Sequence, residues 1–93
     1  MIQSFADAET EKLFNHRKSR RLPANVHRVA LRKLAQLNAV YELNQLAVPP
    51  GNSLEALKKD RAGQHNIRIN DQWRLCFVWR GQHPYDVEIV DYH

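Results

Sequence analysis

Residues 73–79, WRLCFVW, place a large apolar side chain at every second position. In an extended backbone, successive side chains point to opposite faces of the sheet. One face of this segment therefore carries Trp73, Leu75, Phe77 and Trp79. The other face carries Arg74, Cys76, Val78 and Arg80. We predict a strand whose tryptophan face packs on a core and whose arginine face does not.

Further strands are expected on both sides of this segment. HNIRI (65–69) alternates Ile67 and Ile69 with polar residues, and LEALKKD (54–60) is expected to be a short extended piece. NDQ (70–72) predicts a turn, because Asn and Asp side chains bond their own backbone. RGQHPYD (80–86) predicts a hairpin loop, and VEIVDYH (87–93) predicts a last strand. Together these segments indicate an antiparallel meander.

The first half of the chain predicts helices. MIQSF (1–5) is expected to be a short first strand, and Asp7 can cap a helix over 7–16 by accepting bonds from its free amides. Pro23 suits the first position of a second helix. An apolar stripe with helical spacing follows at Val26, Ala30, Leu34, Leu37 and Tyr41. We expect this helix to run to Leu46, with a break near Asn38 allowed, and AVPPGNS (47–53) to end it.

The order of these elements predicts an α+β fold. A short N-terminal strand and two to three helices would pack on one face of an antiparallel sheet. A chain of 93 residues has no room for a second core, so residues 1–93 are expected to form a single domain.

The charge balance points to a polyanionic partner. Fourteen Lys and Arg against ten Asp and Glu give a net charge of +4. The bases are uneven, because no acid lies between Glu11 and Lys33, and a second basic group runs from Lys58 to Arg80. Nucleic acid is the first hypothesis for the partner, and a generally basic surface is the alternative.

Several classes of protein are disfavoured by residues that are missing. No His pair stands at ligand spacing and no Gly-rich phosphate loop occurs, so neither a metal nor a cofactor is expected. No stretch reaches the roughly 20 apolar residues of a membrane helix, and no signal peptide is recognisable. The single Cys76 cannot form an internal disulfide and is expected to be a buried thiol in a cytoplasmic protein.

Cations and proton carriers gather in the C-terminal half, where RNA cleavage without a metal is chemically feasible. Such cleavage needs a base for the 2′-hydroxyl, cations for the phosphorane and an acid for the leaving oxygen. The same residues also have purely structural explanations. Arg74 can be an ordinary solvent-facing residue, Tyr92 can bury its ring at the end of the sheet, and His65 can be a surface histidine. In a regular strand, moreover, Asp91 and His93 face away from Tyr92.

The segment LEALKKDRAGQHNIRINDQWRLCFVW (54–79) and the terminal VEIVDYH resemble the HigB group of bacterial toxins in the RelE/ParE superfamily, which belongs to type II toxin–antitoxin systems. MIQSF and the basic KSRR (18–21) are similar too. The resemblance implies a small RelE-like toxin that enters the ribosomal A site and cuts the messenger there. It also implies a helix-turn-helix, HigA-like antitoxin that neutralises the toxin.

Site residues follow from the resemblance by position. Lys58 matches the family's catalytic lysine, Arg74 its catalytic arginine, and Asp91, Tyr92 and His93 its terminal motif. The positions expected to contact RNA are Lys59, Arg61, His65 and Arg68. Glu55 stands where some relatives carry a histidine, and a carboxylate there is expected to repel phosphate and lower activity.

Two other functions are compatible with the same residues. A ParE-like, non-catalytic inhibitor would bind a protein target such as DNA gyrase, although it would need no proton carriers at the C-terminus. A plain RNA-binding module would bind in a salt-sensitive way without cutting.

Overall fold

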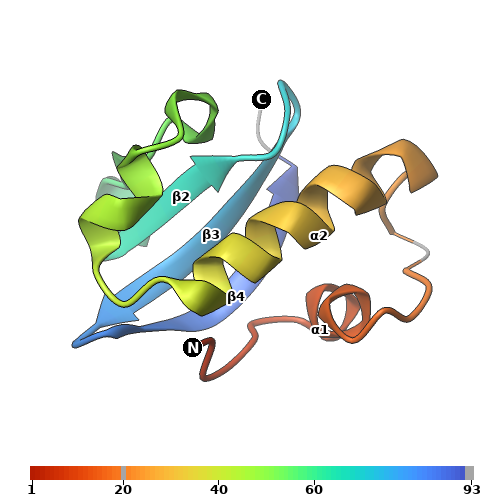
Figure 1. Cartoon of the computed structure of the whole chain (residues 1–93), viewed down its shortest axis with the longest axis horizontal. Coiled ribbons are helices and arrows are strands. Elements are labelled where there is room, and N and C mark those ends of the chain that lie inside the picture. Colours follow the sequence, from red (N-terminus) through yellow and green to blue (C-terminus); the bar gives the residue numbers. More distant parts are fainter. Residues whose placement is uncertain (20, 92–93) are drawn as a thin grey trace.

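The computed structural model describes residues 1–19 and 21–91 and has the predicted α+β class. The helices are α1 (Ala8–Phe14) and α2 (Ala24–Ala39). The strands are β1 (Glu55–Ala56), β2 (Gln64–Arg68), β3 (Trp73–Arg80) and β4 (His83–Asp91), in one antiparallel sheet of order β1-β2-β3-β4. Short 3₁₀ helices span Leu43–Ala47 (η1), Pro50–Asn52 (η2) and Lys59–Arg61 (η3). Helix α2 crosses one face of the sheet, and α1 packs beside it near β4 (Figure 1).

The core lies between α2 and the sheet. Val26, Ala30, Leu34 and Leu37 are buried along one side of α2, as the apolar stripe predicted. From the sheet, Ile67, Leu75, Phe77, Val87 and Ile89 are fully buried against them. Trp73 is buried in this core as predicted, whereas Trp79 is only partly buried and packs against the core.

Helix α2 ends close to the break expected near Asn38 and does not continue to Leu46. The helix stops at Ala39, and Val40 has an extended backbone with ψ 150°. Tyr41 therefore leaves the apolar stripe and is 59% exposed, so its assignment to the stripe was wrong. Leu46 belongs to the separate turn η1, which begins with a reciprocal capping box between Glu42 and Gln45. This local cap competes with helix continuation, and it explains why the helix does not reach Leu46.

The N-terminal segment is extended but is not a strand of the sheet. Its single bridge pairs Phe5 in parallel with Val87. The Ala6 amide donates to the Val87 carbonyl at 2.9 Å, and the Val87 amide donates to the Ser4 carbonyl at 3.1 Å. A β-bulge shifts the β3–β4 register here, and Asp86 has a φ of 53°. Because a bulge bends its strand and interrupts pairing, the predicted first strand is reduced to this bridge.

The turns are partly as predicted. Asp7 caps α1, since its Oδ1 accepts from the Thr10 amide at 3.1 Å. Asn70 Oδ1 accepts from the amides of Gln72 and Trp73, which confirms the NDQ turn. The predicted loop at 80–86 is too long, because β4 already begins at His83. Gly81 has a φ of 60°, a conformation open to glycine, and this allows a tight two-residue connection.

Candidate active site

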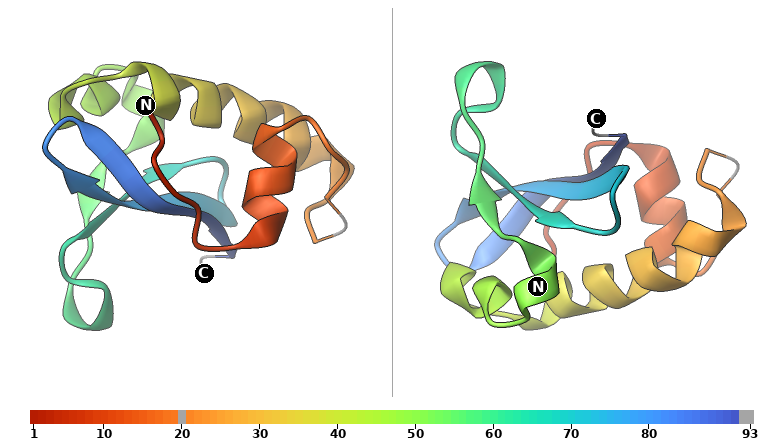
Figure 2. Two further views of the ribbon diagram at one scale, coloured as in Figure 1. Left: turned by 90° about the horizontal axis from the view of Figure 1, so that it is seen from below. Right: turned by 90° about the horizontal axis from the view of Figure 1, so that it is seen from above.

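The face of the sheet opposite α2 carries the side chains that alternate with the core. The strand register pairs Arg74 with Arg68 and Val90, and it pairs Cys76 with Asn66 and Glu88. Glu55 of β1 pairs with Asn66 and so shares this face. The segment between β1 and β2, which contains η3, projects from the sheet on the side away from α2 (Figure 2). We call this side the open face and define it by Glu55, Asn66, Arg68, Arg74, Cys76 and Glu88.

Arg74 is anchored on the open face by two neutral acceptors. Its Nη1 donates to Asn66 Oδ1 at 3.0 Å and to the Ser53 carbonyl at 3.3 Å. Ser53 lies in the loop before β1 and has a φ of 46°, which is uncommon for a residue with a side chain. These two bonds fix the direction of the guanidinium, and neither acceptor carries a charge.

Asn66 links this arginine to Glu55. Its side chain is fully buried, and its Nδ2 donates to Glu55 Oε1 at 3.1 Å. Glu55, Asn66 and Arg74 therefore form a continuous chain of hydrogen bonds across three strands. The effect of the Glu55 carboxylate on phosphate binding stays a prediction.

The predicted lysines lie on the projecting segment. Lys58 is the residue before η3, and Lys59 follows with a φ of 58°. Both are exposed. A pocket of about 490 Å³ is lined by residues 55–61, so Lys58 and Glu55 border the same hollow.

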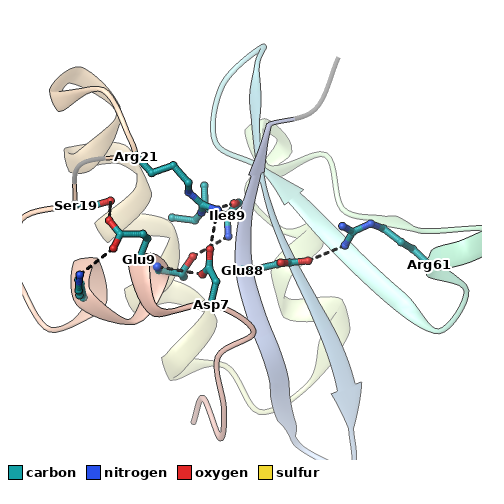
Figure 3. Close-up of polar contacts among 9 residues, drawn as sticks. Asp7, Glu9, Ser19, Arg21, Arg61, Glu88 and Ile89 are labelled. Carbon is teal, nitrogen blue, oxygen red and sulfur yellow. Dashed lines mark hydrogen bonds and ion pairs between the residues drawn. The ribbon is translucent and has the colours of Figure 1, made fainter.

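Arg61 connects the segment between β1 and β2 to β4, the strand at the opposite edge of the sheet, through an ion pair. Its Nη1 contacts Glu88 Oε1 of β4 at 2.8 Å (Figure 3). The same nitrogen donates to Gln64 Oε1 at 3.1 Å. Both side chains of the ion pair are partly exposed, and such pairs are worth about 0.2–1 kcal/mol. Arg61 therefore stays within reach of a ligand while it restrains the segment.

The remaining predicted RNA contacts are divided between the faces. Arg68 lies on the open face and pairs with Asp71, whose side chain is 98% exposed. His65 pairs with Phe77 in the register, and its ring stacks on the Phe77 ring with centroids 6.2 Å apart. Since Phe77 belongs to the core, His65 does not share the face of Arg74.

The end of β4 places Asp91 on the side of Trp73, its register partner. Gln72 Nε2 donates to Asp91 Oδ2 at 3.2 Å. A second pocket, of about 460 Å³, is bordered by both Asp91 and Arg61. Tyr92 and His93, which the sequence assigns to the site, lie outside the described residues.

Cys76 is the buried thiol that the sequence predicted. Burial is the main cause that raises its pKa to about 11, the positive charge of Arg61 opposes this, and the carboxylate of Glu88 adds to it. The thiol is therefore neutral near pH 7 and is no nucleophile. Among residues 1–19 and 21–91, no cluster of three His, Cys, Asp or Glu side chains could hold a metal ion.

Sequence reasoning missed several residues that support the site. Asn66 was placed only as a polar neighbour of Ile67, and nothing in the alternating, largely polar segment HNIRI marked it out. Nothing in the sequence indicated that Ser53 or Gln72 would contact a residue of the site. Arg21 belongs to the basic segment KSRR, and its guanidinium pairs with Asp7 at 2.7 Å and donates to the Ile89 carbonyl at 2.7 Å (Figure 3). Arg21 is exposed, as expected for a basic connection, but its contacts with Asp7 and with the edge of β4 were not foreseen.

Comparison with known proteins assigns the family of this chain. Residues 3–93 match the model of a family described as the RelE-like toxin of the type II toxin–antitoxin system HigB. The chain belongs to this HigB-like toxin family. It is 36% identical over 80 residues to Toxin HigB-1 of Vibrio cholerae serotype O1, covering 85% of this chain and 84% of that protein. An uncharacterised protein of Haemophilus influenzae is 37% identical over 59 residues, which are 63% of this chain and 58% of the relative.

Solved structures support the fold of this HigB-like toxin. YafQ from Escherichia coli BL21(DE3) matches with a TM-score of 0.55 and 13% identity, covering 98% of this chain and 93% of YafQ. A mutant of YafQ from Escherichia coli matches with a TM-score of 0.56, 15% identity and the same coverage. The predicted RelE-like α+β fold and the resemblance to the HigB group are confirmed. As a type II toxin, the protein has an antitoxin as its partner. No helix in the described part of the chain is both long and apolar enough to span a membrane.

Proposed function

We propose that this HigB-like toxin is a ribosome-dependent endoribonuclease that cuts translated mRNA in the A site and needs no metal ion for the cleavage. The observation that carries the proposal is the environment of Arg74. An amide oxygen and a backbone carbonyl anchor its guanidinium on the open face, and a guanidinium fixed in direction suits the planar, two-point recognition of a phosphate. The family membership supports the same conclusion.

The reaction assigns a role to each site residue. Arg74 holds the scissile phosphate, and Lys58 stabilises the charge of the phosphorane or assists removal of the 2′ proton. Asp91 or His93 moves protons, and Tyr92 positions the RNA. Lys59, Arg61 and Arg68 contribute positive charge along the RNA backbone.

The protein partner in this proposal is a helix-turn-helix, HigA-like antitoxin, and the place of action is the cytoplasm. A neighbouring reading frame that encodes a small helix-turn-helix protein would support this part. Co-expression of that protein should restore growth.

Primer extension on a translated message tests the activity. A purified translation system is run with and without the toxin, and the same RNA is also incubated without ribosomes. New 5′ ends inside codons that form only during translation are expected, and they should persist after addition of a zinc-selective chelator. Growth inhibition with intact message and impaired gyrase supercoiling would indicate the ParE-like alternative. Salt-sensitive binding without any cut would indicate a plain RNA-binding module.

A further inference from the structure

We infer that Asn66 is a positioning residue that holds the guanidinium of Arg74 in its working orientation, and that Glu55 fixes the orientation of the Asn66 amide. The inference rests on the proposed function, because it assigns these residues to the support of a catalytic arginine. Asn66 itself is not expected to touch the RNA.

The first step is the geometry at Arg74. Nη1 carries two hydrogens, and it has two acceptors, Asn66 Oδ1 at 3.0 Å and the Ser53 carbonyl at 3.3 Å. A guanidinium is planar, so two bonds at one nitrogen restrict rotation of the whole plane. One acceptor comes from β2 and the other from the loop before β1, so the arginine is held from two separate segments.

The second step is the orientation of the amide. An asparagine side chain can turn to present either its oxygen or its NH₂ group to a neighbour. An NH₂ group turned toward the guanidinium would set donor against donor. Glu55 prevents this, because its carboxylate oxygen accepts the hydrogen bond from Asn66 Nδ2 at 3.1 Å. The Asn66 oxygen is thereby directed to Arg74, so the carboxylate at position 55 has a task other than repulsion of phosphate.

The third step is burial. The Asn66 side chain is fully buried, so its own oxygen and nitrogen are shielded from water, while Glu55 is exposed and Arg74 is partly exposed. Hydrogen bonds in such surroundings are electrostatically stronger than bonds exposed to water. Asn66 is also neutral, whereas a carboxylate in its place would offset the charge that the phosphate requires.

A double-mutant cycle on cleavage tests the inference. The rate at saturating message is measured for wild type, Asn66→Ala, Arg74→Ala and the double variant. We expect Asn66→Ala to lower the maximal rate by about 10- to 10²-fold, as for a misplaced catalytic group. In the Arg74→Ala background, Asn66→Ala should change the rate little, because its effect acts through the arginine.

Thr10→Ala is the matched control. Thr10 is also fully buried, and its hydroxyl accepts a hydrogen bond from the Ile89 amide at 3.0 Å. It should lower the melting temperature but leave the maximal rate of the folded protein unchanged. Equal rates for Asn66→Ala and wild type, or independent effects of the two substitutions in the cycle, would overturn the inference.

The part assigned to Glu55 has its own pair of variants. Glu55→Gln keeps an acceptor for Asn66 and removes the charge, so its cleavage should equal or exceed that of wild type. Glu55→Ala removes the acceptor, and its cleavage should fall. Equal or higher cleavage in Glu55→Ala would refute the assignment of Glu55.

A measurement that does not depend on cleavage separates this inference from the proposed function. The order parameter of the Arg74 Nε–Hε group by NMR should fall in Asn66→Ala and stay unchanged in Thr10→Ala. An unchanged order parameter in Asn66→Ala would refute the positioning role. If wild type cuts no message, the proposed function fails, while the NMR comparison still decides whether Asn66 orders Arg74.

Discussion

At the scale of single residues, three arginines on or beside the open face are held in place by other parts of the chain. Arg61 and Arg68 pair with the carboxylates of Glu88 and Asp71. Arg74 is anchored by an amide oxygen and a backbone carbonyl. These two bonds fix the direction of the Arg74 guanidinium, which suits a group that holds the scissile phosphate.

Replacement of Arg74 by alanine is therefore expected to reduce cleavage by about 10² to 10³-fold, because a charge-assisted contact made in the transition state is worth about 2.7–4 kcal/mol. The protein should stay folded, since the core does not include Arg74. Arg80→Ala is the matched control on the same strand, where Arg80 lies 5.2 Å from the Tyr85 ring centroid. Primer extension gives the rates and circular dichroism the folding. Full cleavage by folded Arg74→Ala would remove this residue from the site.

Cys76 predicts a specific alkaline destabilisation. Its pKa is raised from 9.0 to about 11 in the folded protein, mainly by burial. The unfolded chain therefore loses the thiol proton first, and the stability contributed by the neutral thiol is lost as the pH rises from about 9 to about 11. Urea unfolding of wild type and Cys76→Ala is compared across this range. The wild type should lose more stability than the variant, and parallel curves would contradict the raised pKa.

At the scale of elements, β4 is an edge strand that segments distant in sequence protect. The Ile89 amide donates to the Thr10 hydroxyl of α1, and the Ile89 carbonyl accepts from Arg21 (Figure 3). Unpaired strand edges invite association with other chains. These contacts occupy backbone groups at the free edge of β4, and they hold the strand that leads to Asp91.

The N-terminal cap of α1 can be tested with two substitutions of Asp7. Asp7→Ala removes both the cap to Thr10 and the ion pair with Arg21. It should lower the free energy of unfolding by about 0.5–2 kcal/mol, the usual cost of a lost cap. Asp7→Asn keeps a capping oxygen and should cost less. Urea denaturation measures both, and equal losses would assign the effect to the ion pair instead.

The terminal residues are tested by truncation. A chain that ends at Asp91 keeps the β3–β4 pairs that the described residues form, up to Trp73 with Asp91. We expect little change in melting temperature but no cleavage, because His93 is of the residue type that transfers protons near neutral pH. Melting and ribosome-dependent cleavage are assayed in parallel. A truncated protein that melts as before and still cuts would exclude the terminal residues from the site.

At the scale of the whole molecule, one sheet serves two purposes on its two faces. Its α2 side is a continuous apolar core, and its open face carries the hydrogen-bonded chain from Glu55 to Arg74. The net charge of +4 adds a general attraction for RNA. Binding of RNA should therefore depend on salt.

Affinity for a single-stranded RNA oligonucleotide is expected to fall as KCl rises. Each phosphate contact contributes about 0.7 to the slope of log affinity against log salt. Lys59→Gln should lower the magnitude of this slope by about 0.7, the share of one phosphate contact. Lys12→Gln is the control, because Lys12 lies on α1 and pairs with Glu9. Fluorescence anisotropy measures both. If only Lys12→Gln reduced the slope, the RNA would bind near α1 and not near the segment that carries Lys59.

Much of the fold could be predicted because its signals are local. Alternation in WRLCFVW identified β3 and its buried face, helical spacing identified most of the α2 stripe, and Asp7 identified the start of α1. The errors lie where a remote or competing contact decided the outcome. Tyr41 lies outside the apolar stripe because the Glu42–Gln45 cap starts a new turn. MIQSF forms only a single bridge because of the bulge near Asp86.

For the site, the sequence by itself determined which residue types were present and, through the alternation of β3, that Arg74 faces away from the core. The tertiary structure alone decided what holds Arg74. Ser53 and Arg74 are 21 residues apart, and Asn66 and Glu55 are 11 apart, so their contacts exist only once the strand register is set. The same register placed His65 on Phe77, away from Arg74. Alternation along one strand follows from backbone geometry, whereas a hydrogen bond between strands depends on which residues the completed sheet brings face to face.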